Sequence, residues 1–380
     1  MTPTVALAIT MQTMGTELTK EAKTRWPLPS PQQELKVLMI AELDQRIGGL
    51  RRGPHLRVKY APSGVRYYVP GDLTRLYVAP PTYERLPPSQ AIASILRQVG
   101  RLLKPAVGEG FDLVHTFFVD LTRSSVPCVH ESDQSVSQYL SGYLMLEGLP
   151  ERLLRPVVDA MVSRCLAVVT WSSWAADGFV SDGADRDRVY VIPPPMQLGE
   201  PRPHGGLNVL VVGRDPRRKG LDLALSAFRK ATRGLNGSVK LFVIGPVGQL
   251  LDPADRNIVA IERASEEYLH EDLLPITDIV LAPSRAEAYN LTVLEAMAHG
   301  AVPVVSNVGG LPELVLDGGI MVPPEDDYSL AEAIESLVFD DGLREKLSAR
   351  TLEIVAKRHN PEMIGESIQK VYLRALEEGS

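Results

Sequence analysis

Short runs of β-branched and aliphatic residues alternate with helical patterns along almost the whole chain, and this alternation constrains the fold most. Such runs, separated by helix-length segments, are typical of parallel α/β proteins. Six strands are predicted in the first half, at 35–42, 65–70, 112–118, 126–132, 166–172 and 188–193. Six more are predicted in the second half, at 207–213, 239–245, 257–262, 278–284, 302–307 and 319–324. The pattern therefore predicts two consecutive Rossmann-like domains.

The length of the chain agrees with two domains, because 380 residues exceed what one hydrophobic core usually supports. Residues 193–206 are rich in proline and glycine and have no periodicity, as expected of an interdomain linker. Two helices are expected to close the chain, at 342–358 and 362–378. We divide the chain into an N-terminal extension (1–34), an N-terminal domain (35–195) and a C-terminal domain (196–360). A last helix (361–380) is expected to pack back on the N-terminal domain.

The composition is that of a globular protein with an acidic balance. The net charge of −7, from 40 basic and 47 acidic residues, argues against a nucleic-acid partner. The chain has no uninterrupted apolar run of about 18 residues, and its N-terminus has no basic segment typical of a signal peptide. Cys128 and Cys165 lie far apart in sequence without metal-ligand spacing. We therefore expect reduced cysteines and a cytoplasmic protein.

A pair of cations follows the first strand of the second half. Arg214 stands at the exit of this strand, and Lys219 follows after four intervening residues. Two cations at a strand–helix turn, beside free backbone N–H groups, form a site for an anion such as a diphosphate. The alternative is a solvated basic turn that also includes Arg217 and Arg218.

Two carboxylates follow the strand at 278–284. Glu287 lies in the loop, and a helix is expected to begin near Leu291 with Asn290 as its N-cap. Glu295 lies in the most apolar part of this helix. A carboxylate among apolar neighbours costs several kcal/mol unless it is hydrogen-bonded. A ligand diol, such as that of a ribose, would satisfy Glu295, and so would an arginine of the protein.

Together, the segments VVGRDPRRKG and APSRAEAYNLTVLEAMAHGAVPVVSNVGGLPELV resemble the retaining glycosyltransferases of the GT-B fold, specifically glycosyltransferase family 4. Members carry an Arg-x4-Lys pair, a Glu-x7-Glu pair and a Gly-Gly-x-Pro-Glu turn. The matching positions here are Arg214 and Lys219, Glu287 and Glu295, and 309–313. The resemblance is strong over 207–358 and weaker, but in the same order, over 35–195. It implies an N-terminal acceptor domain and a C-terminal donor domain that face a central cleft.

The resemblance also implies the reaction: transfer of a hexosyl group from a UDP- or GDP-sugar to an acceptor hydroxyl, with retention and without a metal ion or other cofactor. Arg214 and Lys219 would hold the diphosphate, Glu295 the ribose hydroxyls, and Glu287 would face the transferred sugar. Backbone N–H groups would bind sugar hydroxyls and phosphate at Tyr289, Asn290, Leu291 and Thr292. The acceptor would be a sugar, a lipid-linked compound or a small molecule, in glycan, glycolipid or cell-envelope biosynthesis.

Two positions depart from the family pattern. Where many relatives place a histidine near the transferred sugar, this chain has Asp133, which either takes over a hydrogen bond to the sugar or indicates a different donor orientation. The usual Gly-aromatic-Gly loop is replaced by Ala288, Tyr289 and Asn290. Asparagine tolerates left-handed backbone angles, so the turn is expected to survive.

The region after the first strand matches the family least. It keeps Gly48 and Gly49, the expected phosphate-side loop, but Gly53, Pro54 and Pro62 disfavour a helix through 50–64. A group of basic residues in this region could recognise a phosphorylated acceptor or place the protein at the inner face of a membrane: Arg46, Arg51, Arg52, Arg57, Lys59 and Arg66. A solvated basic face explains the same residues equally well. For His115, Trp171 and Trp174, structural roles are expected.

Two other functions fit the same fold. A GT-B sugar-nucleotide epimerase would share the diphosphate site, although it should not need both motif pairs. A catalytically silent sugar-nucleotide-binding subunit is compatible with the departures at Asp133 and Ala288. A dinucleotide dehydrogenase is disfavoured because no predicted strand is followed by Gly-x-Gly-x-x-Gly.

Overall fold

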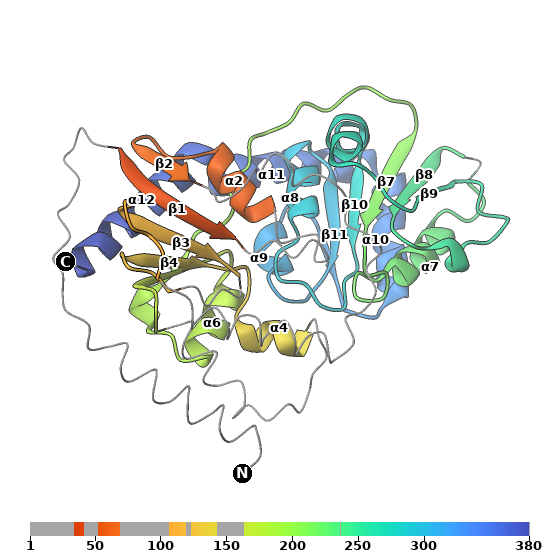
Figure 1. Ribbon diagram of the computed structural model, residues 1–380. Coiled ribbons are helices and arrows are strands. Elements are labelled where there is room, and N and C mark those ends of the chain that lie inside the picture. The colour runs from red at the N-terminus through yellow and green to blue at the C-terminus, as the bar shows by residue number, and fades with distance from the viewer. Residues whose placement is uncertain are drawn as a thin grey trace, which may run out of the picture.

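The structure is a computed structural model that describes residues 34–41, 52–68, 106–118, 123–142, 163–235 and 237–379. Two parallel six-stranded sheets lie side by side, with helices around them (Figure 1). We call the part built on the first sheet the N-lobe and the part built on the second sheet the C-lobe. The predicted α/β fold with two Rossmann-like sheets is confirmed.

The N-lobe sheet has the order β2-β1-β3-β4-β5-β6, and all its pairings are parallel. Its strands are β1 (Leu35–Ala41), β2 (Val65–Tyr68), β3 (Leu113–Phe117), β4 (Cys128–Glu131), β5 (Ala167–Thr170) and β6 (Val189–Val191). Each lies within the corresponding predicted range. The residues that connect this sheet to the C-lobe, 193–206, contain no helix or strand, in agreement with the predicted linker.

The C-lobe sheet has the order β12-β11-β10-β7-β8-β9 and is also parallel throughout. Its strands are β7 (Leu207–Val212), β8 (Val239–Ile244), β9 (Ile258–Ile261), β10 (Ile279–Ala282), β11 (Val302–Ser306) and β12 (Ile320–Val322). They confirm the six predicted strands. Strand order reverses between β7 and β10, and in open parallel sheets ligands bind at the carboxyl ends of the strands beside such a reversal.

The helices cover both sheets. They are α2 (Arg52–Lys59), α4 (Val136–Gly142), α6 (Ser173–Ser181), α7 (Leu221–Ala231), α8 (Leu291–Ala298), α9 (Leu311–Val315), α10 (Asp327–Phe339), α11 (Asp341–Arg358) and α12 (Pro361–Glu378). Short helical turns are η2 (Arg186–Arg188), η3 (Gly248–Leu250), η4 (Tyr268–Leu273) and η5 (Leu274–Ile276). The two closing helices agree with the predicted ranges, and Asn360 caps the second.

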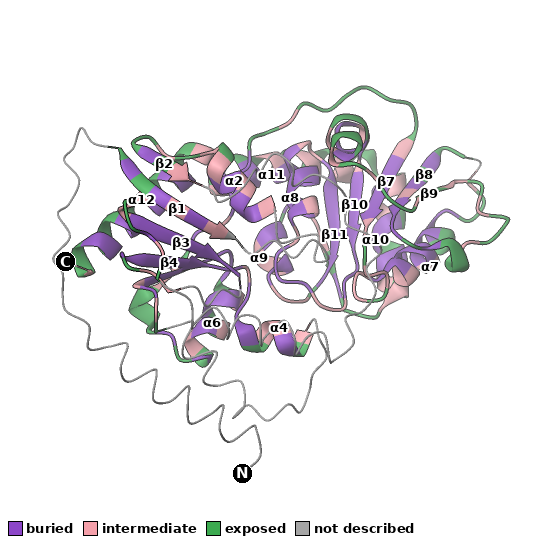
Figure 2. Cartoon of the chain, viewed as in Figure 1, coloured by how far each residue is buried: buried purple, intermediate pink, exposed green. Residues whose placement is uncertain are grey.

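The central strands of both sheets lie in the interior, as Figure 2 shows by colour, whereas β6, β9 and β12 are partly exposed. Every residue of β3, β10 and β11 is buried. Burial on both faces is why these strands read as continuous apolar runs in the sequence. Helix α12 contributes Ile368, Tyr372 and other apolar residues to the core of the N-lobe sheet, although it follows the C-lobe in the chain. The exact domain boundaries stay a prediction.

The expectation against a helix through 50–64 is wrong for Arg52–Lys59, which form α2, and holds for 60–64, which contain no helix. Gly53 and Pro54 lie in the first turn of α2, where backbone N–H groups have no partner within the helix and proline costs little. The helix ends before Pro62. At Gly53 a Cβ would lie 2.7 Å from Trp171 Cζ2, so the small residue lets α2 approach this buried indole.

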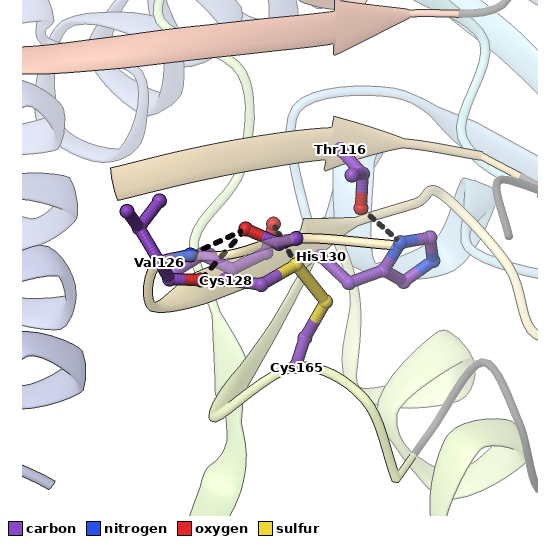
Figure 3. The surroundings of a disulfide bond; sticks show 7 residues. Thr116, Val126, Cys128, His130 and Cys165 are labelled. Carbon is purple, nitrogen blue, oxygen red and sulfur yellow. Dashed lines mark hydrogen bonds between the residues drawn. A yellow bond between two sulfur atoms is a disulfide. The ribbon is translucent and has the colours of Figure 1, made fainter. Parts of the chain in front are cut away.

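The expectation of two separate, reduced cysteines is also wrong. Cys128 and Cys165 form a disulfide, with Cα atoms 4.5 Å apart (Figure 3). Cys165 comes shortly before β5, which pairs in parallel with β4, and Leu166 N donates to Cys128 O at 2.8 Å. Strand pairing therefore brings together two residues that are 37 positions apart.

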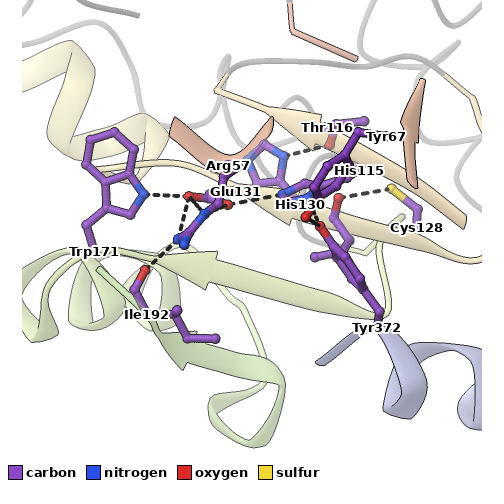
Figure 4. A network of polar contacts seen from close by, with 11 residues as sticks. Arg57, Tyr67, His115, Thr116, Cys128, His130, Glu131, Trp171, Ile192 and Tyr372 are labelled. Atoms are coloured by element: carbon purple, nitrogen blue, oxygen red, sulfur yellow. Dashed lines mark hydrogen bonds and ion pairs between the residues drawn. The ribbon is translucent and has the colours of Figure 1, made fainter. Parts of the chain in front are cut away.

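A buried polar network joins several elements of the N-lobe around Glu131, at the end of β4 (Figure 4). Arg57 Nε donates to both carboxylate oxygens at 3.0 Å, and Trp171 Nε1 donates to Oε1 at 2.6 Å. His115 Nε2 lies 3.2 Å from Oε2, and its Nδ1 lies 2.6 Å from the hydroxyl of Tyr372. Burial alone would raise the pKa of Glu131, but Arg57 and His115 outweigh it and lower the pKa to about 2.

This network predicts a large loss of stability when Arg57 is removed. Arg57→Ala leaves Glu131 charged and buried without its main partner, which should lower the free energy of unfolding by about 3 kcal/mol. Urea denaturation measures the difference. The matched control is Arg186→Ala, which removes an exposed ion pair with Asp177 and should change stability by less than about 1 kcal/mol. Equal stability of both variants would contradict the role of the network.

Candidate functional site

The loops after β7 and β10 meet at the reversal of strand order. Arg285 N, after β10, donates to Arg218 O, after β7, at 2.7 Å. Gly220 has φ of 66°, and a Cβ there would overlap the carbonyl oxygen of Pro283. The loops are therefore fixed against each other, and the side chains that they carry share one edge of the sheet.

Lys219 and Glu287 form an ion pair at this edge: Lys219 Nζ donates to Glu287 Oε2. The carboxylate also accepts from Asn290 Nδ2 at 3.1 Å and from Ser284 Oγ at 3.3 Å, and Arg218 Nη1 lies 3.8 Å from Oε1. Glu287 is buried, and this set of donors explains how its charge is tolerated. Burial lowers the pKa of Lys219, while Glu287 acts in the opposite direction. Two of the predicted site residues are thus in direct contact.

Arg214 lies two residues beyond the end of β7 and is exposed. It stands on the same loop as Lys219, where Lys219 N donates to Asp215 O at 3.0 Å. The structure therefore places both predicted diphosphate-binding cations on the loop at the carboxyl end of β7.

The turn into α8 forms as predicted. Asn290 is the N-cap, with φ of 70°, and its side chain accepts from Val293 N at 3.2 Å. Ala288 and Tyr289 are buried, and the ring of Tyr289 packs 5.8 Å from that of Trp171. The side chain of Tyr289 therefore packs in the core between the lobes.

The Gly-Gly turn supports this loop from behind. Gly309 has φ of 58°, and a Cβ there would overlap the carbonyl oxygen of Glu287. Gly310 N donates to Ala288 O at 3.0 Å. Glu313, in the same turn, accepts from the backbone N–H groups of Ser173 and Trp174 at 2.7 and 2.8 Å. The motif thus holds the Glu287 loop and also caps α6 of the N-lobe.

Glu295 is buried, as predicted, and in this structure its partner is an arginine. Arg52 Nη1 donates to Glu295 Oε2 at 2.8 Å and to Thr292 Oγ1 at 3.1 Å, and Arg52 Nη2 lies 2.5 Å from Glu266 Oε2. His270 Nε2 lies 3.6 Å from Glu295 Oε1. Burial raises the pKa of Glu295, and Arg52 opposes the shift. The arginine partner considered from the sequence is therefore confirmed as a contact of Glu295.

Asp133 follows β4 of the N-lobe by two residues and is half-buried. Its Oδ1 is buried and has no hydrogen-bond partner in the described part of the chain. Burial and the charge of Glu287 raise the pKa of Asp133 to about 7, while Arg218 and Lys219 act in the opposite direction. Asp133 of the N-lobe is therefore close enough to the Lys219–Glu287 pair of the C-lobe to interact with it electrostatically.

The remaining predicted site residues have different outcomes. Gly48 and Gly49 lie outside the described residues. Of the predicted basic group, Arg57 is buried on Glu131 and Arg52 is held by Glu295, so neither contributes to a solvated basic face. Sequence reasoning missed Glu266 and the role of Arg52 near Glu295. The contact of Arg52 with Glu295 was not predicted because the helix that positions Arg52 was not expected.

The environment of Asp133 generates a prediction about pH. Because its pKa is raised in the folded protein, Asp133 favours folding at low pH, and this contribution is lost as pH rises from about 4 through about 7. Asp133→Asn removes the ionisation. The free energy of unfolding of the Asp133→Asn variant, relative to that of wild type, should therefore increase by about 2 kcal/mol between pH 5 and pH 8, allowing for partial exposure.

Chemical denaturation of both proteins at the two pH values tests this, with Asp177→Asn, at an exposed position, as the control. A difference between Asp133→Asn and wild type that stays constant with pH would contradict the prediction.

Two findings concern the described residues as a whole. None of the described helices has the length and apolar character needed to cross a membrane. Within the same residues, no group of three or more His, Cys, Asp or Glu side chains is arranged to hold a metal ion.

Comparison with known proteins places this geometry in context. The sequence model of the family Glycosyl transferases group 1 matches residues 206–340, which include both motif pairs. A D-inositol 3-phosphate glycosyltransferase of Acidothermus cellulolyticus is 27% identical over 308 residues, which cover 70% of this chain and 68% of that protein.

Solved structures share the fold. The sucrose-phosphate synthase of Thermosynechococcus elongatus superposes with a TM-score of 0.67 at 19% identity, covering 92% of this chain and 100% of that chain. The Anabaena protein HepE, in complex with UDP-glucose, superposes with a TM-score of 0.63 at 16% identity, covering 89% of this chain and 99% of that chain. The chain therefore has the GT-B fold, and the sequence comparisons support a glycosyltransferase.

Proposed function

We propose that the chain is a retaining glycosyltransferase of family 4 that moves a hexosyl group from a UDP- or GDP-sugar to an acceptor hydroxyl, without a metal ion. The observation that carries the proposal is the convergence of Lys219 and Glu287, with Asp133 from the other lobe, at the reversal of strand order. The UDP-glucose complex of HepE supports a sugar nucleotide as the donor.

The diphosphate of the donor would lie at the carboxyl end of β7. Arg214 and Lys219 supply two positive charges there, and cations fixed in advance stabilise a leaving group whose negative charge grows as the glycosidic bond breaks. Lys219 is held by Glu287 and is only partly exposed, so its ammonium group needs little rearrangement when the diphosphate binds. This arrangement takes the electrostatic role that a metal ion has in other transferases.

The transferred sugar would lie between the lobes. Glu287 from the C-lobe and Asp133 from the N-lobe would accept or share hydrogen bonds with its hydroxyls. The left-handed Asn290 and the free N–H groups at the start of α8 would bind further hydroxyls and phosphate oxygens, because a helix N-terminus favours negative charge. The Oδ1 of Asp133, which is buried and has no hydrogen-bond partner among the described residues, supports a ligand at this point.

The reaction would exchange one bond at the anomeric carbon. The bond to the diphosphate oxygen breaks, and a bond to the acceptor oxygen forms on the same face of the sugar. The proton of the acceptor hydroxyl would pass to the departing phosphate oxygen. The nucleoside diphosphate leaves with the bonding electrons, and Arg214 and Lys219 neutralise its charge. The proposed acceptor is a sugar, lipid-linked or small-molecule hydroxyl compound, used in the cytoplasm or at the inner face of a membrane.

Incubation with a panel of UDP- and GDP-sugars, with and without candidate acceptors, tests the proposal. Release of the nucleoside diphosphate that depends on an acceptor, with the α-configuration of the donor kept in the product, is the expected result. Interconversion of the donor sugar without release would instead identify an epimerase. Binding without either reaction would identify a silent subunit.

Removing Lys219 should mainly slow the chemical step. In Lys219→Ala the leaving diphosphate loses one of its two cations, and kcat should fall about 100-fold. Steady-state kinetics measure this, and a thermal melt checks that the variant folds. Lys230→Ala is the matched control. Lys230 lies on α7, and the substitution removes its ion pair with Asp327 of α10. An unchanged kcat in Lys219→Ala would refute the assignment.

Removing Glu295 should mainly weaken donor binding. Glu295→Ala deletes the acceptor proposed for the two ribose hydroxyls, so KM for the donor should rise about tenfold with a smaller change in kcat. Donor-dependent initial rates give both constants. A KM equal to that of wild type would show that the ribose binds elsewhere.

A further inference from the structure

Helix α2 is anchored in the N-lobe by its second arginine. Arg57 Nε binds both oxygens of Glu131 at 3.0 Å, and its Nη2 donates to the carbonyl oxygen of Ile192 at 2.8 Å. Arg57 and Glu131 are almost completely buried. These contacts fix α2 on the N-lobe sheet, and they hold Arg52, at the start of the helix, against the C-lobe.

The first residue of the same helix contacts the C-lobe. Arg52 is 17% exposed and binds three side chains of the C-lobe. Glu266 lies just before η4, and Thr292 and Glu295 lie on α8. The side chain of Glu295 is only 6% exposed beneath it. Arg52 therefore joins the lobes and covers the carboxylate on the C-lobe side.

The occupied carboxylate is the one that the proposed function reserves for the ribose. A ribose diol binds a carboxylate by donating two hydrogen bonds to its oxygens. Oε2 of Glu295 already accepts from Arg52 at 2.8 Å, and Oε1 lies 3.6 Å from His270 Nε2. With so little of the side chain exposed, a ribose cannot reach these oxygens while Arg52 remains in place.

We propose that Arg52 competes with the donor ribose for Glu295 and must be displaced when the donor binds, so that Arg52 lowers the affinity for the nucleotide. This inference rests on the proposed function. Arg52 keeps a second partner when it leaves, because Glu266 Oε2 lies 2.5 Å from its Nη2. The guanidinium can thus move aside without losing all its charge compensation, which lowers the cost of the exchange.

Displacement of a partly exposed ion pair costs the ligand a modest factor in affinity. From the strength of such pairs, we expect the competition to raise the Kd of the nucleotide by about five- to tenfold. A residue that bound the nucleotide, or merely kept the fold intact, would have the opposite effect when removed. The direction of the change therefore identifies the role.

Isothermal titration of the full chain with UDP and with GDP, at pH 8, tests the inference. Arg52→Ala should bind the preferred nucleotide about five- to tenfold more tightly than wild type, and Arg52→Gln should change in the same direction. Arg350→Ala is the matched control, because Arg350 is also held by two carboxylates, Asp317 and Glu353, and should leave the Kd unchanged. Thermal melts show whether the variants fold. If Arg52→Ala does not fold, Arg52→Gln, which is also neutral, takes its place in the test.

The other outcomes distinguish a failure of the proposed donor site from a failure of the competition by Arg52. If wild type binds a nucleotide and Lys219→Ala does not, the donor site is where we propose it. Equal or weaker binding by both Arg52 variants then overturns the competition alone. If neither wild type nor the Arg52 variants bind UDP or GDP, the proposed donor site fails, and the competition fails with it.

Discussion

A carboxylate enclosed in a protein is costly unless a cation reaches it, and three buried carboxylates of this chain meet this requirement through distant segments. Glu287 is paired with Lys219, Glu295 with Arg52 and Glu131 with Arg57. Each pair joins two elements, so satisfying the charge also fixes how these elements lie. The first pair fixes the loops at the strand reversal, the second joins the lobes, and the third holds α2 on the N-lobe.

This constraint links the fold to the proposed chemistry. Parallel strands bring their carboxyl ends to one edge, and the reversal between β7 and β10 brings the loops that carry Lys219 and Glu287 together. The Gly-Gly turn at Gly309 lies against the Glu287 loop so closely that a side chain would not fit. Asp133 enters from the N-lobe, so the proposed sugar site requires both lobes.

The sequence was sufficient for the strands, because β-branched runs buried on both faces leave a continuous apolar signal. It was also sufficient for the cap at Asn290, which follows from local backbone chemistry. It was insufficient where a contact depends on tertiary structure. The Cys128–Cys165 disulfide depends on the pairing of β4 with β5, and the partner of Glu295 lies 243 residues away. Helix α2 was missed because the usual penalty for proline does not apply in a first turn.

The central proposal is that the carboxyl edges of the two sheets converge on one sugar nucleotide, whose diphosphate is held by the C-lobe. The most direct measurement is a crystal structure of the chain with UDP-glucose bound. Our account predicts the diphosphate between Arg214 and Lys219 at the end of β7, with the ribose beside Glu295 and the glucose between Glu287 and Asp133. A nucleotide bound outside this cleft, with the Lys219–Glu287 pair remote from its phosphates, would contradict the account.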